Sequence, residues 1–324
     1  MGMDPISKFA NEIIASSIDP NAATQDKAFA QAMIIAQPVA PLEEKGVIEV
    51  METEADQAVF TVMVEHTPTW RTIDTRGAEA ASNGSYSAFG TPTYATATIL
   101  TRSATYFIHD SVSLVNPVTF ESIAKSIGNQ IKKKKILDAI TTLTTEASYT
   151  EATSVYNAGG FIAATSVTSA HVIAPNDFVL SKKDMKSKTT PVVPDVALLH
   201  SSQLNSMENS ANFSPGQTTN SNYKKAKFDE FGHLIEFDGM EIIELLEAEA
   251  AQQSSSPFGS STKGHWAVIG RRDLMLGRGE NNKKNTVEDF RDPKTHGTQR
   301  TVNVNYGYVL KYPDGIRLLR CYDA

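Results

Sequence analysis

Two stretches of the chain alternate between bulky and small or polar residues, which is the period of a β-strand. The first, residues 59–64, is rich in β-branched side chains. The second, residues 93–111, places Tyr94, Thr96 and Thr98 at alternate positions. Residues 67–92 between them are mostly small or polar. This pattern predicts an extended two-stranded arm with its tip at 67–92. Because two strands alone are marginally stable in water, we expect the arm to lie on a neighbouring subunit.

A long helix is predicted from Asn116 to about Thr145. Asn116 suits the N-cap, and Pro117 suits the first helical position. The apolar stripe changes side partway along, so the helix is expected to serve two packing environments, as a spine about 45 Å long. The early stripe holds Phe120, Ile123, Ala124, Ile127 and Ile131, and the later one holds Ile136, Ile140 and Leu143.

Shorter signals complete an α+β pattern. Residues 1–41 contain one short helical stripe and predict an arm with little core of its own. A short helix is expected in 175–188, a buried strand at 196–200 and a helix from Ser201 onwards. Asp238-Gly239 predicts the turn of a hairpin. Strands are expected at 266–269, 299–312 and 315–322, with a turn at 313–315 between the last two.

The composition is that of an ordinary globular protein. The chain has 324 residues, of which 40% are hydrophobic, 21% charged and 8% aromatic. No apolar stretch approaches the roughly 18 residues of a membrane span, and the first nine residues lack the pattern of a secretory signal. The lone cysteine, Cys321, cannot form an intramolecular disulfide and is expected to be an inert thiol, either buried or on an edge strand.

The net charge of −7 is opposite in sign to that of most proteins whose main task is binding nucleic acid. The charge is nevertheless grouped, with acidic blocks at 43–56 and 229–249. Such blocks indicate either contact between copies or with a charged partner, or simply solvated faces. The same alternatives apply to a basic tetrad on the long helix, where solvated surface competes with contact to DNA phosphates or to an acidic partner. The tetrad consists of Lys132, Lys133, Lys134 and Lys135.

Motifs that would carry catalysis are weak. The seven histidines lack the spacing of a helical zinc site, and Gly277-Arg278-Gly279 followed by lysines lacks the remainder of a phosphate-binding loop. Ser122 and Lys125 match the Ser-x-x-Lys spacing of some hydrolases, but so short a pattern is expected by chance. We therefore expect no catalytic residue, no metal site and no cofactor, with a Ser/Lys hydrolase as the remote enzymatic alternative.

Taken in order, these features resemble the major capsid protein of tailed double-stranded DNA viruses, whose coat fold is named after bacteriophage Hong Kong 97. The stretches that carry the resemblance are 93–109 leading into the helix at 116, 194–201, 232–235 with 239–243, 266–270, 291–293 and 304–308.

The resemblance implies a division of the chain along the lines of that fold. It gives an N-terminal arm (1–46), a peripheral-domain strand with the extended β-loop (47–115), the spine helix (116–148), a connection (149–190), the axial domain (191–264) and a closing β-segment (265–324).

It also implies pentamers and hexamers that tile an icosahedral shell around packaged DNA. The expected location is the virion, and the host cytoplasm during assembly. Scaffold, portal and decoration proteins are possible partners, and no membrane is involved. Because no lysine occurs between Lys45 and Lys125, the covalent crosslinking of some relatives is not expected. An encapsulin-type container and a tail or baseplate protein are the structural alternatives. Contacts between subunits are expected at Trp70, Arg71, Arg76, Tyr86 and Phe89.

Overall fold

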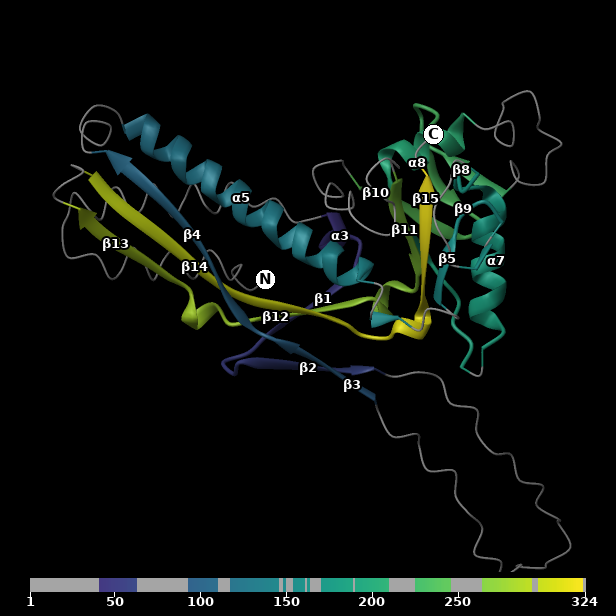
Figure 1. Ribbon diagram of the computed structural model, residues 1–324, viewed down its shortest axis with the longest axis horizontal. Helices are drawn as coiled ribbons and strands as arrows, with labels where there is room; N and C mark the ends of the chain where they lie inside the picture. The colour runs from purple at the N-terminus through teal and green to yellow at the C-terminus, as the bar shows by residue number, and fades with distance from the viewer. Residues whose placement is uncertain are drawn as a thin grey trace, which may run out of the picture.

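The computed structural model describes two sheets joined by a long helix (Figure 1). The residues it describes are 41–62, 93–109, 117–145, 148–149, 154–160, 162–163, 170–188, 190–209, 225–245, 264–292 and 297–322. Residues 1–40, which make up most of the N-terminal arm predicted at 1–46, and residues 67–92, the predicted tip of the extended loop, lie outside these ranges. The domain boundaries therefore stay predictions.

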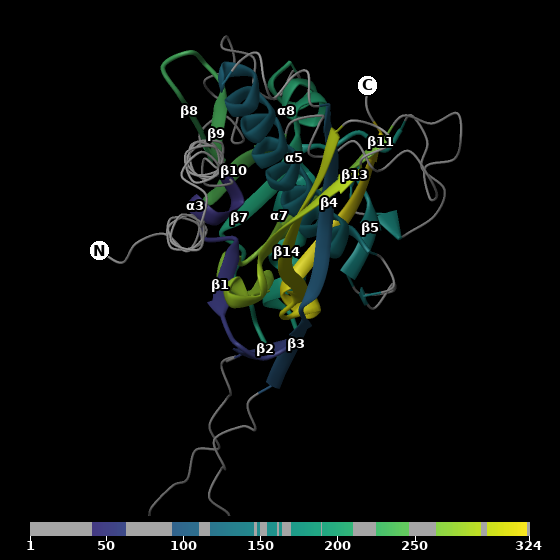
Figure 2. The same cartoon turned by 90° about the vertical axis from the view of Figure 1, so that its left-hand side faces the viewer.

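A five-stranded sheet occupies one side of the molecule and is organised around its longest strand, β14 (Gly297–Leu310). One edge of β14 pairs with β4 (Leu100–His109), and its other edge pairs with β13 (Thr286–Asp292) and then β12 (Leu276–Glu280). Strand β1 (Ile48–Glu52) adds to β12 in parallel. Because β14 carries partners along its whole length, it determines the direction of the sheet on which the helix lies (Figures 1 and 2).

Helix α5 (Pro117–Thr144) contains 28 residues and is about 42 Å long at 1.5 Å per residue. In its first half, Ile127 and Ile131 pack against Val302 of β14. In its second half, the side chains of Ile136, Ala139, Ile140 and Leu143 enter a different and larger core. Among the described side chains the predicted change of apolar face is confirmed, because Ile127 and Ile131 pack in one core and the later stripe packs in another. Phe120, Ile123 and Ala124 of the early stripe lie outside the described side chains.

An eight-stranded sheet lies beyond the C-terminal end of α5, with the strand order β6-β5-β15-β11-β7-β10-β9-β8. Its central strand β7 (Val196–His200) is buried at every position. Val196 and Leu198 enter the core shared with α5, whereas Ala197 and Leu199 enter a second core on the opposite face. A strand buried on both faces needs a continuous apolar run, which explains the pattern at 196–200.

The remaining elements of this half follow the sequence closely. Helices α7 (Pro175–Lys186) and α8 (Ser201–Glu208) contribute side chains to the second core. The predicted hairpin turn is confirmed, since Asp238 and Gly239 have φ values of 51° and 82°. The other strands are β5 (Val155–Asn157), β6 (Ile162–Ala163), β8 (Ala226–Phe228), β9 (Leu234–Phe237), β10 (Met240–Leu245), β11 (Gly264–Gly270) and β15 (Ile316–Tyr322).

A two-stranded ribbon made of β2 (Gln57–Val62) and β3 (Thr93–Thr98) lies against the five-stranded sheet. The predicted pairing of these stretches is confirmed. The single strand expected at 93–111 is divided at Ile99, whose N–H donates to the carbonyl oxygen of Asp56 at 2.9 Å. The division lets β3 pair with β2 while β4 pairs with β14.

The turn predicted at 313–315 exists as a 3-10 turn, η6 (Pro313–Gly315), but it does not form a hairpin. The strands on either side of it, β14 and β15, belong to different sheets. The turn therefore carries the chain from the five-stranded to the eight-stranded sheet. Three further short elements are present: α3 (Pro41–Glu44) precedes β1, η4 (Arg272–Leu274) links β11 to β12, and η5 (Asn282–Lys284) links β12 to β13.

Candidate assembly surfaces

The β2–β3 ribbon rests on glycines of the five-stranded sheet. A Cβ on Gly277 would lie 2.7 Å from the ring of Phe60, and one on Gly279 would lie 2.5 Å from the Cβ of Ala58. A Cβ on Gly307 would lie only 1.9 Å from the carbonyl oxygen of Thr98. Glycine at these places allows a backbone or side chain to approach a strand more closely than any other residue would. The ribbon is thus seated on its own chain by close packing.

The inward face of the ribbon is apolar and its outward face is exposed. Ala58 and Phe60 are buried together with Ala95 and Ala97, whereas Val59 and Tyr94 point to solvent with 46% and 59% exposure. The last pair of the ribbon joins Val62 to Thr93. Residues 63–92 therefore connect the two strands at this end of the ribbon, so the chain leaves the ribbon and rejoins it at the same place.

All five residues predicted to contact a neighbouring subunit fall in that span: Trp70, Arg71, Arg76, Tyr86 and Phe89. They lie outside the described residues, and their role stays a prediction.

The acidic block at 43–56 pairs with cations of its own chain. Glu54 accepts from Lys283 and Asp56 from Lys284, each at 2.5 Å, and Glu49 pairs with Lys311 at 2.5 Å. Glu43 pairs with Arg278. Of the alternatives for this block, its ion pairs therefore favour internal neutralisation over attraction to another molecule. The lysines that follow Gly277-Arg278-Gly279 are engaged in these pairs.

A buried ionic cluster holds the middle of α5 to the sheet. Lys135 donates to Glu280 at 2.9 Å, and Glu280 also lies 2.9 Å from Arg278. Burial alone would raise the pKa of Glu280, but Lys135 and Arg278 outweigh it, so the pKa is lowered. Burial also raises the pKa of the nearby Tyr308 to about 12. The cluster joins three segments distant in sequence at the point where the apolar stripe of α5 changes side.

The lysine tetrad is therefore divided between different surroundings. Lys135 faces inward, and Lys134 pairs with Asp138 one turn further along at 2.8 Å. Lys132 is half-buried and Lys133 is exposed. Only part of the tetrad faces solvent, and contact with DNA or with an acidic partner stays a prediction for those side chains.

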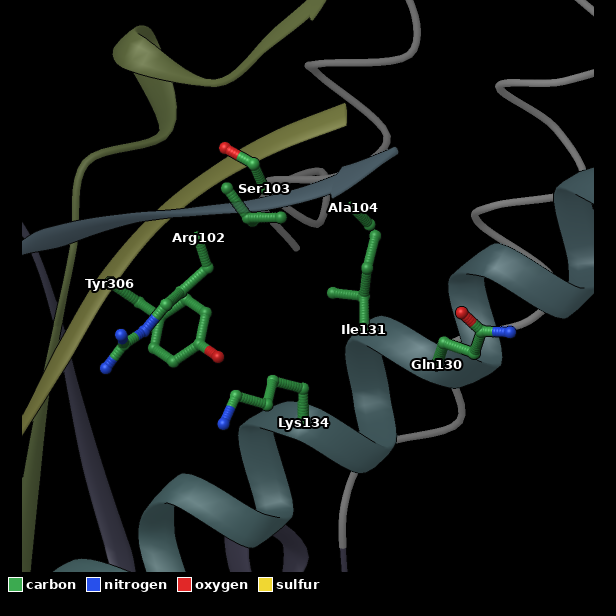
Figure 3. A pocket seen from close by; sticks show the side chains of 8 residues that line it. Arg102, Ser103, Ala104, Gln130, Ile131, Lys134 and Tyr306 are labelled. Carbon is green, nitrogen blue, oxygen red and sulfur yellow. The ribbon is translucent and has the colours of Figure 1, made fainter. Parts of the chain in front are cut away.

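A hollow of about 250 Å³ separates α5 from the sheet beside the tetrad. Arg102 and Tyr306 extend from the strands towards Lys134 on the helix (Figure 3). The carboxylate of Asp138 joins all three side chains, because it lies 3.4 Å from Arg102, accepts from the Tyr306 hydroxyl at 3.0 Å and pairs with Lys134. The side chains around the hollow are thus tied together by one acid.

The residues weighed for catalysis are not assembled into a site in the described part of the chain. No group of three potential metal ligands occurs among the described residues. His200 and His265 stack on each other with their ring centroids 3.6 Å apart, as aromatic packing. Ser122 and Lys125 belong to α5, and their side chains lie outside the described set. No described helix has the length and apolar character needed to cross a membrane.

Solved structures share this arrangement along most of the chain. The capsid of Ralstonia phage GP4 matches with a TM-score of 0.56 at 10% identity, over 86% of this chain and 87% of that chain. The Cyanophage Pam1 capsid matches with a TM-score of 0.56 at 11% identity, over 89% and 94%. The chain has the Hong Kong 97-like coat fold.

An encapsulin from Synechococcus elongatus shares this coat fold with a TM-score of 0.52 at 9% identity, over 89% of this chain and 93% of that chain. No family model and no curated protein matches the sequence. At such identities the comparison establishes the coat fold through the path of the chain and not through shared residues.

Sequence reasoning missed the glycine seat of the ribbon and the buried ionic cluster. Gly277 and Gly279 drew attention only as a weak phosphate-loop pattern. The sequence did contain a signal for this seat: two glycines stand at alternate positions in a strand-like stretch. Such spacing leaves one face of a strand without side chains, so that another segment can pack closely on it. Nothing local identified Arg278 and Glu280 as buried, since their partners are distant in sequence.

Proposed function

We propose that this chain is the major capsid protein of a tailed double-stranded DNA virus. Its copies assemble into pentamers and hexamers, and these form an icosahedral shell around the packaged genome. The observation that carries the proposal is the coat fold, shared with phage capsid chains over 86–89% of this chain. The role is structural, and it requires neither a cofactor nor a metal.

The seat of the ribbon supports a specific mechanism of assembly. Phe60 is fully buried against Gly277, so the base of the arm cannot swing freely. The base from which residues 63–92 depart is therefore fixed, and the proposal is that these residues contact a neighbouring copy. Each contact between copies can then be weak, because many contacts per subunit act together in a closed shell.

Deleting residues 77–90 tests this mechanism. The deletion removes the tip of the arm and leaves the ribbon and both sheets intact. We expect a folded chain, with circular dichroism like that of the full chain, that forms no closed shells in negative-stain micrographs. Normal shells from the deleted chain would show that the arm is dispensable for assembly.

Further partners follow from the proposed role. The shell would contact portal, decoration and scaffold proteins, first in the host cytoplasm and later in the virion. The shell would contact the DNA inside it only indirectly, and the members of the tetrad that keep solvent exposure, Lys132, Lys133 and Lys134, are the candidate contact.

A protein container of the encapsulin type is the second candidate, because an encapsulin shares the fold with a TM-score of 0.52. The two functions differ in their contents. Particles isolated from their natural source and treated with nuclease should still yield double-stranded DNA if the chain is a viral coat. A protein cargo without DNA would favour the container.

A further inference from the structure

A rigid turn holds one phenylalanine out in solvent. The turn joins β8 to β9, and the Asp229 carboxylate accepts the N–H groups of Phe231 at 2.9 Å and His233 at 2.8 Å. The N–H of Gly232 donates to the carbonyl oxygen of Asp229 at 3.1 Å, with Gly232 at a φ of 89°. The side chain of Phe231 is 78% exposed, more than any other large apolar residue described. The turn is fixed by its own hydrogen bonds, so this exposure is built into the backbone.

A basic hollow lies on the outer side of α7. It has a volume of about 400 Å³. Lys182 is already committed to Asp238 at 3.1 Å, but Lys183 and Lys186 form no ion pair with any described residue. The hollow therefore combines apolar surface, from Val179 and the aliphatic parts of the lysine side chains, with positively charged ammonium groups at its edge. Its lining consists of Val179, Lys182, Lys183, Lys186, Ser187 and Asp238.

The turn and the hollow complement each other in charge. Phe231 follows two acidic residues, Asp229 and Glu230, whereas the hollow presents Lys183 and Lys186, for which the described residues provide no acidic partner. An aromatic side chain flanked by acids fits an apolar depression with a cationic rim.

The turn and the hollow lie at opposite ends of one strand. Strand β9 starts just after the turn and ends just before Asp238 at the hollow. Its four residues, at about 3.3 Å each, separate the two surfaces by more than about 10 Å. In Figures 1 and 2 the turn lies at the top of the eight-stranded sheet, in green, and β9 leads away from it. Two different patches of one copy generate head-to-tail contacts, which close into rings when the rotation permits.

We propose that the turn of one copy docks, Phe231 first, into the α7 hollow of the next copy, so that copies associate head to tail around a ring. This contact rests on the proposed shell function and names the surfaces that build its rings. Phe231 supplies the buried anchor, and Glu230 faces Lys183 and Lys186 across the junction.

Cysteine crosslinking of the full chain tests the contact directly. His233→Cys places a thiol on the turn and Ser187→Cys places one at the hollow, while the native Cys321 is buried. With a short bis-maleimide, the chain carrying both substitutions should give a ladder of crosslinked species up to five and six copies. An equal mixture of the two single-cysteine chains should give dimers and nothing larger, because each chain then carries one introduced thiol and can be crosslinked to one neighbour alone. Each single-cysteine chain alone should give none.

Substitutions then identify the anchor. Phe231→Ser, or Lys183→Glu together with Lys186→Glu, should reduce the crosslinked fraction at least about tenfold, as loss of an interface anchor does. Phe290→Ser is the matched control, since Phe290 is 65% exposed on the other sheet. It should leave the crosslinked fraction unchanged.

Two outcomes would overturn the contact. Dimers from a single-cysteine chain alone would show a symmetric contact, and no crosslink in the mixture would show that the surfaces do not meet. If the wild-type chain still forms shells in that case, the contact is wrong and the proposed function stands. If the wild-type chain forms neither rings nor shells, alone or after co-expression with the genes that neighbour its own, and no crosslink appears, the proposed function fails and the contact fails with it.

Discussion

The glycine seat of the ribbon makes a quantitative prediction about Phe60 and Gly277. Phe60 is fully buried, so Phe60→Ala should lower the free energy of unfolding by about 3–5 kcal/mol through the cavity it leaves. Gly277→Ala places a methyl group 2.7 Å from the Phe60 ring, closer than packed atoms tolerate. Overpacking of this kind costs about 1–3 kcal/mol.

The two substitutions should not add. With the ring gone, the methyl group introduced by Gly277→Ala enters the vacated space and relieves part of the cavity. Gly277→Ala should therefore cost almost nothing in the Phe60→Ala background, which gives a coupling energy of at least about 1 kcal/mol. The gentler Phe60→Leu should show the same sign with a smaller magnitude.

Urea unfolding of the unassembled chain, followed by circular dichroism, measures these energies from the midpoint at constant slope. Val59→Ala is the matched control on the outward face of the same strand, where 46% exposure predicts a loss below about 1 kcal/mol. Strict additivity of Phe60→Ala and Gly277→Ala would refute the close contact between ribbon and sheet.

Three further predictions concern the ionic cluster, a loop anchor and the arm. Glu280→Gln removes the acid that Lys135 and Arg278 share and leaves Arg278 with Glu43 alone. It should cost about 3 kcal/mol in urea unfolding, against little change for the exposed control Lys133→Met. Because the pKa of Glu280 is lowered, its contribution to the free energy of unfolding should be present at neutral pH and lost as the pH falls through that pKa. A free energy of unfolding that does not change with pH in this acidic range would contradict the prediction. Asp177→Asn weakens a carboxylate that accepts three backbone N–H groups at 2.8–3.0 Å and should cost about 1–3 kcal/mol; an unchanged midpoint would argue against it. Replacing both Trp70 and Phe89 by alanine should lower the melting temperature of assembled shells, and equal melting would remove them as anchors.

The parts of the fold that sequence predicted correctly rest on local periodicity. The apolar stripe of α5 changes face within one helix, so its two environments were visible from spacing alone. The Asp238-Gly239 turn was equally local, because the residue types themselves favour positive φ. Even the pairing of β2 with β3 needed only two alternating stretches with a small-residue link.

The parts that sequence could not predict depend on long-range contacts. Asp56 pairs with Lys284 across 228 positions, so the acidic block was equally consistent with solvent or with another molecule. The division of a strand at Ile99 follows from two different partner strands. Likewise, the 3-10 turn at 313–315 resembles a hairpin turn until its flanking strands are placed in separate sheets.

Electron microscopy of the purified full chain, with light scattering on the same sample, is the decisive test of the shell function. We expect closed polyhedral particles, or rings of five and six copies, from the chain alone or after co-expression with the genes that neighbour its own. A chain that remains monomeric under both conditions would contradict the shell function.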